Sequence, residues 1–135
     1  MIWNRKFLYP KSTRSVINGS RHYSVNQENL PSVTSILKAT ETSEQKAKLA
    51  SWREKVGYEQ AQITTREAAN RGSALHLYLE SFLLGKLNMD LLGDNTREKM
   101  MADQIIENGL RNKLSEIWGC EATLYYPGKY AGAAD

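Results

Sequence analysis

Apolar residues recur at helical spacing through much of this 135-residue chain. The clearest case is a segment that begins at Thr64 or Thr65 and ends at Gly85. Its regularly spaced apolar residues are Leu75, Leu79, Phe82 and Leu83. Because they lie three or four positions apart, they fall on one face of a helix. The pattern predicts an amphipathic helix with one buried face.

Three further helices are predicted. Pro31 with Ser32 or Thr34 forms a helix start, because proline suits the first turn and a hydroxyl caps free backbone amides. The short apolar face that follows consists of Val33, Ile36 and Leu37. A second helix runs over 43–56 and ends at Gly57. A third covers 95–117, with an apolar stripe of Met101, Ile105, Ile106, Leu110, Leu114 and Ile117.

After Gly119 the periodicity changes to that of strands. Residues 121–126 and the terminal segment that begins at Tyr130 are separated by a Pro127-Gly128-Lys129 turn, which predicts a β-hairpin. The predicted fold class is therefore α/β, with amino-terminal helices leading into a mixed sheet that is truncated after its first hairpin. The last residue, Asp135, is a carboxylate that could hold a divalent cation only with further oxygen ligands. We expect the chain to be the front portion of a longer protein.

The net charge of +3 is unevenly placed. Five basic residues precede Glu28, the first acidic one: Arg5, Lys6, Lys11, Arg14 and Arg21. We expect residues 1–29 to be a basic, flexible arm, and residues 30–135 to form the domain. Aromatic residues are interleaved with these charges, so the arm could also follow a phosphate backbone and stack bases. An Arg- and Ser-rich transit peptide is a third interpretation.

Composition limits the remaining classes. No apolar run approaches the roughly 20 residues of a membrane span, so no membrane association is expected. The single cysteine, Cys120, excludes an internal disulfide framework and a cysteine-ligated zinc site within this stretch. A reducing, cytoplasmic setting is the expectation.

Candidate chemistry concentrates at His76 and Asp135. Glu80 follows His76 by one helical turn, so the imidazole and the carboxylate could bind one cation or each other. Gly72, one turn before His76, leaves room for another backbone or a nucleic-acid strand. Each feature also has an ordinary structural interpretation, as a surface histidine, a helix contact or a turn.

Several short motifs follow one another in a definite order. They are Leu30-Pro31-Ser32-Val33-Thr34-Ser35-Ile36-Leu37, Trp52-Arg53, Gly57, Arg71-Gly72-Ser73-Ala74-Leu75-His76 with Glu80, Glu121, and Tyr130-Ala131-Gly132-Ala133-Ala134-Asp135. Taken together, they resemble the RecB-like branch of the PD-(D/E)XK nuclease superfamily. More closely, the chain resembles phage exonucleases related to mitochondrial genome maintenance exonuclease, over about residues 21–135.

The resemblance implies a restriction-endonuclease-like core and a metal-dependent DNA exonuclease. His76 and Asp135 match metal ligands, here for Mg²⁺ or Mn²⁺, and Glu80 and Glu121 match supporting acidic residues. Arg71 would face phosphate, and Ser32 and Thr34 would also contact DNA, which is expected to be single-stranded or to have free ends. The family's acid-x-lysine motif would follow Asp135, so the chain alone is expected to be inactive. The setting would be a bacterial or phage-infected cell.

Two alternatives from other functional classes remain. A non-catalytic DNA-binding or interaction module would use the basic arm and the helix surfaces without a metal. A purely structural helical domain would not depend on His76 at all. The sequence leaves open the oligomeric state, the cleavage polarity, and exonuclease against endonuclease action.

Overall fold

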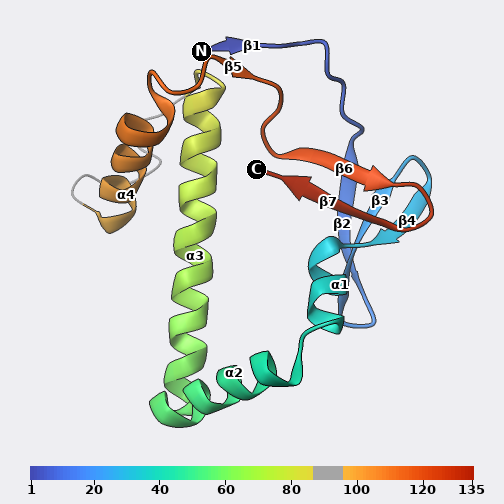
Figure 1. The fold of residues 1–135 in the computed structure, drawn as a ribbon, viewed down its shortest axis with the longest axis vertical. Helices are drawn as coiled ribbons and strands as arrows, with labels where there is room; N and C mark the ends of the chain where they lie inside the picture. The colour runs from blue at the N-terminus through green and yellow to red at the C-terminus, as the bar shows by residue number, and fades with distance from the viewer. Residues whose placement is uncertain (87–95) are drawn as a thin grey trace. The chain divides into compact units, whose positions relative to one another are not determined.

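A computed structural model describes residues 1–86 and 96–135, which form two compact units (Figure 1). The helical unit comprises residues 1–4 and 50–120, and the β unit comprises residues 5–49 and 121–135. Helices and strands are both prominent, which confirms the mixed fold class at this coarse level. The expected division after residue 29 is not seen, because residues 5–49 belong to one unit.

The helical unit is built on α3 (Tyr58–Leu83) and α4 (Arg97–Ile105), which continues as a short π-helix, η2 (Ile106–Leu110). Strand β1 (Ile2–Trp3) pairs in parallel with β5 (Glu116–Ile117). The Trp3 indole Nε1 donates a hydrogen bond of 2.9 Å to the carbonyl oxygen of Leu83. This bond ties the amino-terminal strand to the end of α3.

The core of the helical unit lies between α3 and α4. Its buried residues are Leu75, Tyr78, Ala102 and Ile106, against which Ala74, Leu79, Phe82, Met101 and Leu110 pack. The predicted apolar face of α3 is therefore confirmed for Leu75, Leu79 and Phe82. Tyr78, which the apolar spacing missed, is the most deeply buried member of α3, with 2% of its surface exposed.

The predicted start of α3, at Thr64 or Thr65, is six or seven residues too late. Gly57, with φ 90°, separates α2 from α3 and occupies the N-cap position. Residues 58–63 then continue directly into helix, because Glu, Gln and Ala are good helix formers. Thr65 lies inside the helix, where its hydroxyl donates to the carbonyl oxygen of Ala61, so it caps nothing.

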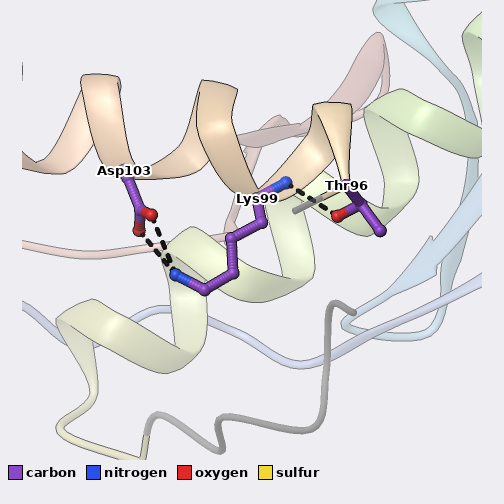
Figure 2. A network of polar contacts seen from close by, with 3 residues as sticks. All are labelled: Thr96, Lys99 and Asp103. Carbon is purple, nitrogen blue, oxygen red and sulfur yellow. Dashed lines mark hydrogen bonds and ion pairs between the residues drawn. The ribbon is translucent and has the colours of Figure 1, made fainter. Parts of the chain in front are cut away.

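The start of α4 is fixed by Thr96. Its hydroxyl accepts a 3.2 Å hydrogen bond from the Lys99 backbone N–H, and the Lys99 ammonium pairs with both oxygens of Asp103 (Figure 2). The Lys99 Nζ also lies 6.0 Å from the centre of the Tyr78 ring. Asn95, the expected first residue of this helix, falls outside the described residues.

The prediction of one helix over 95–117 was wrong in its second half. Asn108 and Gly109 favour helix weakly, and the last turns widen into η2. Asn112 then adopts φ 61°, a left-handed conformation that cannot continue a helix. The chain passes instead into β5, where Ile117 is buried as a strand residue. Of the described helices, none is both long and apolar enough to cross a membrane.

The β unit begins with a three-stranded antiparallel sheet, β2 (Ser12–Ile17), β3 (Ser20–Val25) and β4 (Glu28–Pro31). The expectation of a flexible arm was wrong for these residues. The Asn18-Gly19 and Asn26-Gln27 pairs all have positive φ, as two-residue hairpin turns require. Tyr23, Val25 and Leu30 on one face then supply a core, which the high content of basic residues had obscured.

The bounds of the remaining elements of the β unit follow the sequence prediction closely, but the expected apolar face of Val33, Ile36 and Leu37 is exposed. Helix α1 (Val33–Ala39) begins after Ser32, and α2 (Ser43–Val56), which spans the boundary of the two units, ends at Gly57. The predicted hairpin is present as β6 (Ala122–Tyr126) and β7 (Tyr130–Ala134). Ala131 of β7 completes the core of Tyr23, Val25 and Leu30.

Three side-chain contacts and one backbone bridge hold the hairpin on the sheet. The Ser12 and Thr123 hydroxyls lie 2.7 Å apart, the Asn26 amide donates to the Tyr125 hydroxyl at 2.6 Å, and the Gly128 N–H donates to Glu28 Oε1 at 2.9 Å. A parallel bridge pairs Ser32 with Ala131. Residues about 100 positions apart therefore form one small β structure.

Candidate metal centre

Two acidic side chains meet at the open end of the β6–β7 hairpin. Ala122 pairs with Ala134, and the next residues outward are Glu121 and Asp135. A carboxylate oxygen of Glu121 lies within 4.8 Å of one of Asp135, and both residues are exposed. The hairpin register therefore brings together two of the acidic residues that the sequence analysis selected.

Glu121 has a backbone conformation that is uncommon for its residue type. Its φ of 51° places it in the left-handed region, which side chains other than glycine and asparagine seldom adopt. It stands directly before β6, where the chain turns into the strand. This backbone conformation sets the direction of the Glu121 side chain at the open end of the hairpin.

Two carboxylates at this separation suit a hard divalent cation. Mg²⁺ and Mn²⁺ prefer oxygen ligands, and a nearby cation would offset the repulsion between two negative charges. Mg²⁺ keeps an octahedral shell with several waters, so two carboxylates supply only part of its coordination. The pair could anchor such an ion at the protein surface without enclosing it.

His76 lies on α3, in the helical unit. It is exposed and stands beside the buried Leu75, one position off the apolar face, as the sequence spacing indicated. Glu80 follows one turn later on the same side of the helix and is half-buried. The metal-binding role of His76 and the supporting role of Glu80 stay predictions.

The proposed DNA contacts of Ser32 and Thr34 have different outcomes. Ser32 is 1% exposed, and its Oγ accepts from the Ser35 backbone N–H at 3.0 Å as the N-cap of α1. It also lies 2.8 Å from the Thr34 hydroxyl. Ser32 was therefore wrongly selected as a DNA contact, because its hydroxyl is enclosed by the cap. Thr34 is exposed and Arg71, on α3, is half-buried, and their DNA contacts stay predictions.

The two glycines near the candidate ligands differ in their surroundings. A methyl group placed on Gly72 would meet no described atom within 4 Å apart from its chain neighbours and the nearby backbone of its own helix. A methyl group on Gly132 would lie 3.4 Å from a methyl carbon of Val33, at ordinary contact distance. Gly132 therefore lies where α1 packs on the hairpin, whereas the approach of a nucleic-acid strand to Gly72 stays a prediction.

Positive charge is concentrated in the β unit. That unit contains nine Lys and Arg against five Asp and Glu, a formal net charge of +4. The helical unit has nine against ten, a net charge of −1. The excess of basic residues, predicted for an arm, therefore belongs to a folded unit that also holds Glu121 and Asp135.

Sequence reasoning missed the aromatic pair at the other end of the hairpin. Tyr126 and Tyr130 stand on either side of the turn, with ring centres 5.8 Å apart and ring planes inclined by 29°. The signal was present, because tyrosines that flank a three-residue hairpin turn become direct cross-strand partners.

No family model, no curated protein and no solved structure matches this chain. The resemblance to PD-(D/E)XK nucleases therefore rests on the short motifs and their order along the sequence.

Proposed function

We propose that this chain is part of a metal-dependent DNA exonuclease of the PD-(D/E)XK type, with a restriction-endonuclease-like core. The observation that carries the proposal is the carboxylate pair of Glu121 and Asp135 at the mouth of the β6–β7 hairpin. The motif resemblance assigns metal-ligand roles to Asp135 and to His76. The positive charge of the β unit supports a polyanionic substrate.

The division of labour between residues follows from the chemistry. Hydrolysis of a phosphodiester needs a nucleophilic water and neutralised phosphoryl oxygens, which Mg²⁺ or Mn²⁺ supplies when bound. Asp135 and Glu121 would hold the cation by their oxygens, and the His76 imidazole would add a nitrogen ligand. Glu80, one turn from His76, would orient the imidazole ring by accepting its second N–H. Arg71 and Thr34 would bind phosphate.

In the family that the motifs resemble, a further strand supplies a second carboxylate and a lysine that orients the water. The activity is accordingly proposed for the full-length protein. For residues 1–135 alone, the proposal requires metal binding without turnover.

The first test measures Mn²⁺ binding to residues 1–135 by calorimetry. Asp135→Asn and Glu121→Gln should each weaken binding strongly, because each substitution removes one of two charged ligands. Glu44→Gln is the matched control, since Glu44 is an exposed carboxylate of the same unit that pairs with Lys48. Equal Mn²⁺ affinity in all three variants and the wild type would contradict the metal site.

The second test measures degradation of linear DNA by the full-length protein with Mg²⁺ or Mn²⁺. His76→Ala and Asp135→Asn should reduce degradation to the level seen with EDTA, while Glu44→Gln should retain it. Activity that survives both substitutions would overturn the nuclease assignment.

A DNA-binding module without catalysis is the second candidate, and the charge of +4 on the β unit favours it. Such a module would bind DNA equally well with EDTA and with Mg²⁺, and its affinity would fall steeply with salt. If the full-length protein binds DNA in this metal-independent, salt-sensitive way and does not degrade it, the DNA-binding module is the correct function.

A further inference from the structure

The face of the β6–β7 hairpin that does not pack on the sheet carries an exposed aromatic pair at its turn end, while α1 packs on the same face at Gly132. In the register of the hairpin, Leu124, Tyr126, Tyr130 and Gly132 share one face, while Thr123, Tyr125 and Ala131 face the core. Tyr126 and Tyr130 are 57% and 41% exposed. Two large rings are thus held at the surface, on the face of the hairpin opposite to the one that packs on the sheet.

The end of the hairpin that carries the pair is fixed in place. The Gly128 N–H in the turn donates to Glu28, and Tyr125, next to Tyr126, accepts from Asn26. The turn closes on itself through the Lys129 N–H, which donates to the Tyr126 carbonyl oxygen at 3.0 Å. A preorganised surface loses little conformational entropy on binding, which favours ligand contact at this site.

We propose that Tyr126 and Tyr130 form a stacking platform for the unpaired bases of a single-stranded nucleic acid, with Lys129 contacting the adjacent phosphate. The two rings stack on each other and both side chains are exposed, so a further planar group can contact the pair. Base stacking on aromatic side chains, combined with nearby positive charge, is the usual way in which proteins bind single strands without sequence preference. The inference rests on the proposed function and specifies its substrate as single-stranded.

The position of the pair suits such a role. Tyr126 lies five positions after Glu121, a span of roughly 17 Å at the rise of a β-strand. A nucleic-acid strand that is bound at the turn and extends along β6 would reach the carboxylate pair, and the net positive charge of the β unit favours its binding. The same hairpin would carry the stacking contact at one end and the proposed metal ligands at the other.

Fluorescence anisotropy with a labelled thymidine oligonucleotide tests the platform. The full chain is used in EDTA, so that the readout does not depend on metal or cleavage. The Tyr126→Ala/Tyr130→Ala variant should lose about 5- to 150-fold in affinity for each base contact removed. The Tyr126→Phe/Tyr130→Phe variant should bind like the wild type, because it keeps both rings.

An abasic oligonucleotide of equal length separates stacking from charge. The wild type should bind the abasic strand as weakly as the double alanine variant binds the thymidine strand. The alanine substitutions should not reduce the affinity for the abasic strand any further. Lys129→Ala should weaken binding to both strands equally. Tyr58→Ala, an exposed tyrosine of the helical unit, is the matched control and should change neither.

Several outcomes would overturn the platform. The first is that the double alanine variant binds the thymidine oligonucleotide as tightly as the wild type does. The second is that the alanine substitutions reduce the affinity for the abasic and thymidine strands by the same factor. The third is that the phenylalanine variant fails to bind the thymidine oligonucleotide. The chain could instead self-associate through this face. That result would hold if Leu124→Ala and the double alanine variant abolished self-association and left nucleic-acid binding intact, and it would assign the face to a second copy of the chain. Loss of metal binding in Asp135→Asn bears only on the nuclease proposal, because the platform is measured in EDTA.

Discussion

The two units of this protein bury apolar surface in different ways. In the helical unit, the core joins Leu75 and Tyr78 of α3 to Ala102 of α4 and Ile106 of η2, residues about 30 positions apart. In the β unit, Tyr23, Val25 and Leu30 pack on Ala131, about 100 positions away. The first kind of contact is visible as helical periodicity. The second requires pairing between distant segments, which no local pattern reveals.

The units also differ in charge and in aromatic residues. The net charge of +4 lies on the β unit, together with five of the seven tyrosines, whereas all three tryptophans belong to the helical unit. Polyanion binding and base stacking are thus proposed for one unit only. Tryptophan fluorescence reports on the unfolding of the helical unit. This separation lets each unit be perturbed and observed by itself.

The largest stability effect is expected from Tyr78→Ala in the helical unit. Removing this buried ring leaves a cavity between α3 and α4, and should lower the free energy of unfolding by about 3 to 5 kcal/mol. Urea denaturation followed by tryptophan fluorescence measures it. Leu77→Ala, at the exposed neighbouring position, should change it by less than about 0.5 kcal/mol. Equal effects of the two would refute the assigned core face.

Val25→Ala probes the other core. Val25 is among the most deeply buried side chains, and its truncation should cost about 2 kcal/mol, since two methyl groups are lost from a packed site. Hydrogen exchange should show faster exchange in peptides of β3 and β4. Val16→Ala, on exposed β2, should leave exchange as in the wild type. Unchanged protection in Val25→Ala would mean that residues 12–29 form no packed sheet.

The two N-caps allow a direct comparison between units. Ser32→Ala should destabilise the β unit by about 1 to 2 kcal/mol, because a buried cap hydroxyl is lost and the hydroxyls of Thr34 and Ser35 lose a partner. Thr96→Ala removes the half-buried cap of α4 and should cost about 1 kcal/mol or less. Denaturation midpoints measure both. If Thr96→Ala lost more stability than Ser32→Ala, the expectation that the more deeply buried cap contributes more would be wrong.

The smallest effect is expected from Asp103→Asn. It weakens the pairing of Lys99 with Asp103 on α4, and such (i, i+4) pairs contribute about 0.3 to 0.5 kcal/mol. The difference from wild type in urea denaturation should shrink further in high salt, because salt screens exposed charges. If Asp103→Asn lowered the free energy of unfolding by more than about 1 kcal/mol at all salt concentrations, the ion pair would contribute more than an ordinary surface pair does.

Much of the local structure was determined by the sequence alone. The end of α2 follows from Gly57, the α1 start from Pro31 and Ser32, and the hairpin from its Pro127-Gly128-Lys129 turn. The cap of α2 is Thr42, whose hydroxyl accepts from the Gln45 N–H, and not the expected Ser43. The apolar face of α3 was readable from Leu75, Leu79 and Phe82. These features depend on capping, turn conformation and helical period, all of which act within a few residues.

Other features depended on tertiary structure. Basic residues suggested a flexible arm, yet Tyr23, Val25 and Leu30 form a sheet, because Ala131 and Tyr125 cover one of its faces. Ser32 was selected as a surface contact, but packing encloses it as a cap. The meeting of Glu121 and Asp135 depends on the cross-strand register, which sets which residues stand opposite one another. Local preferences choose helix, strand and turn, whereas burial and register are decided only when distant segments pack together.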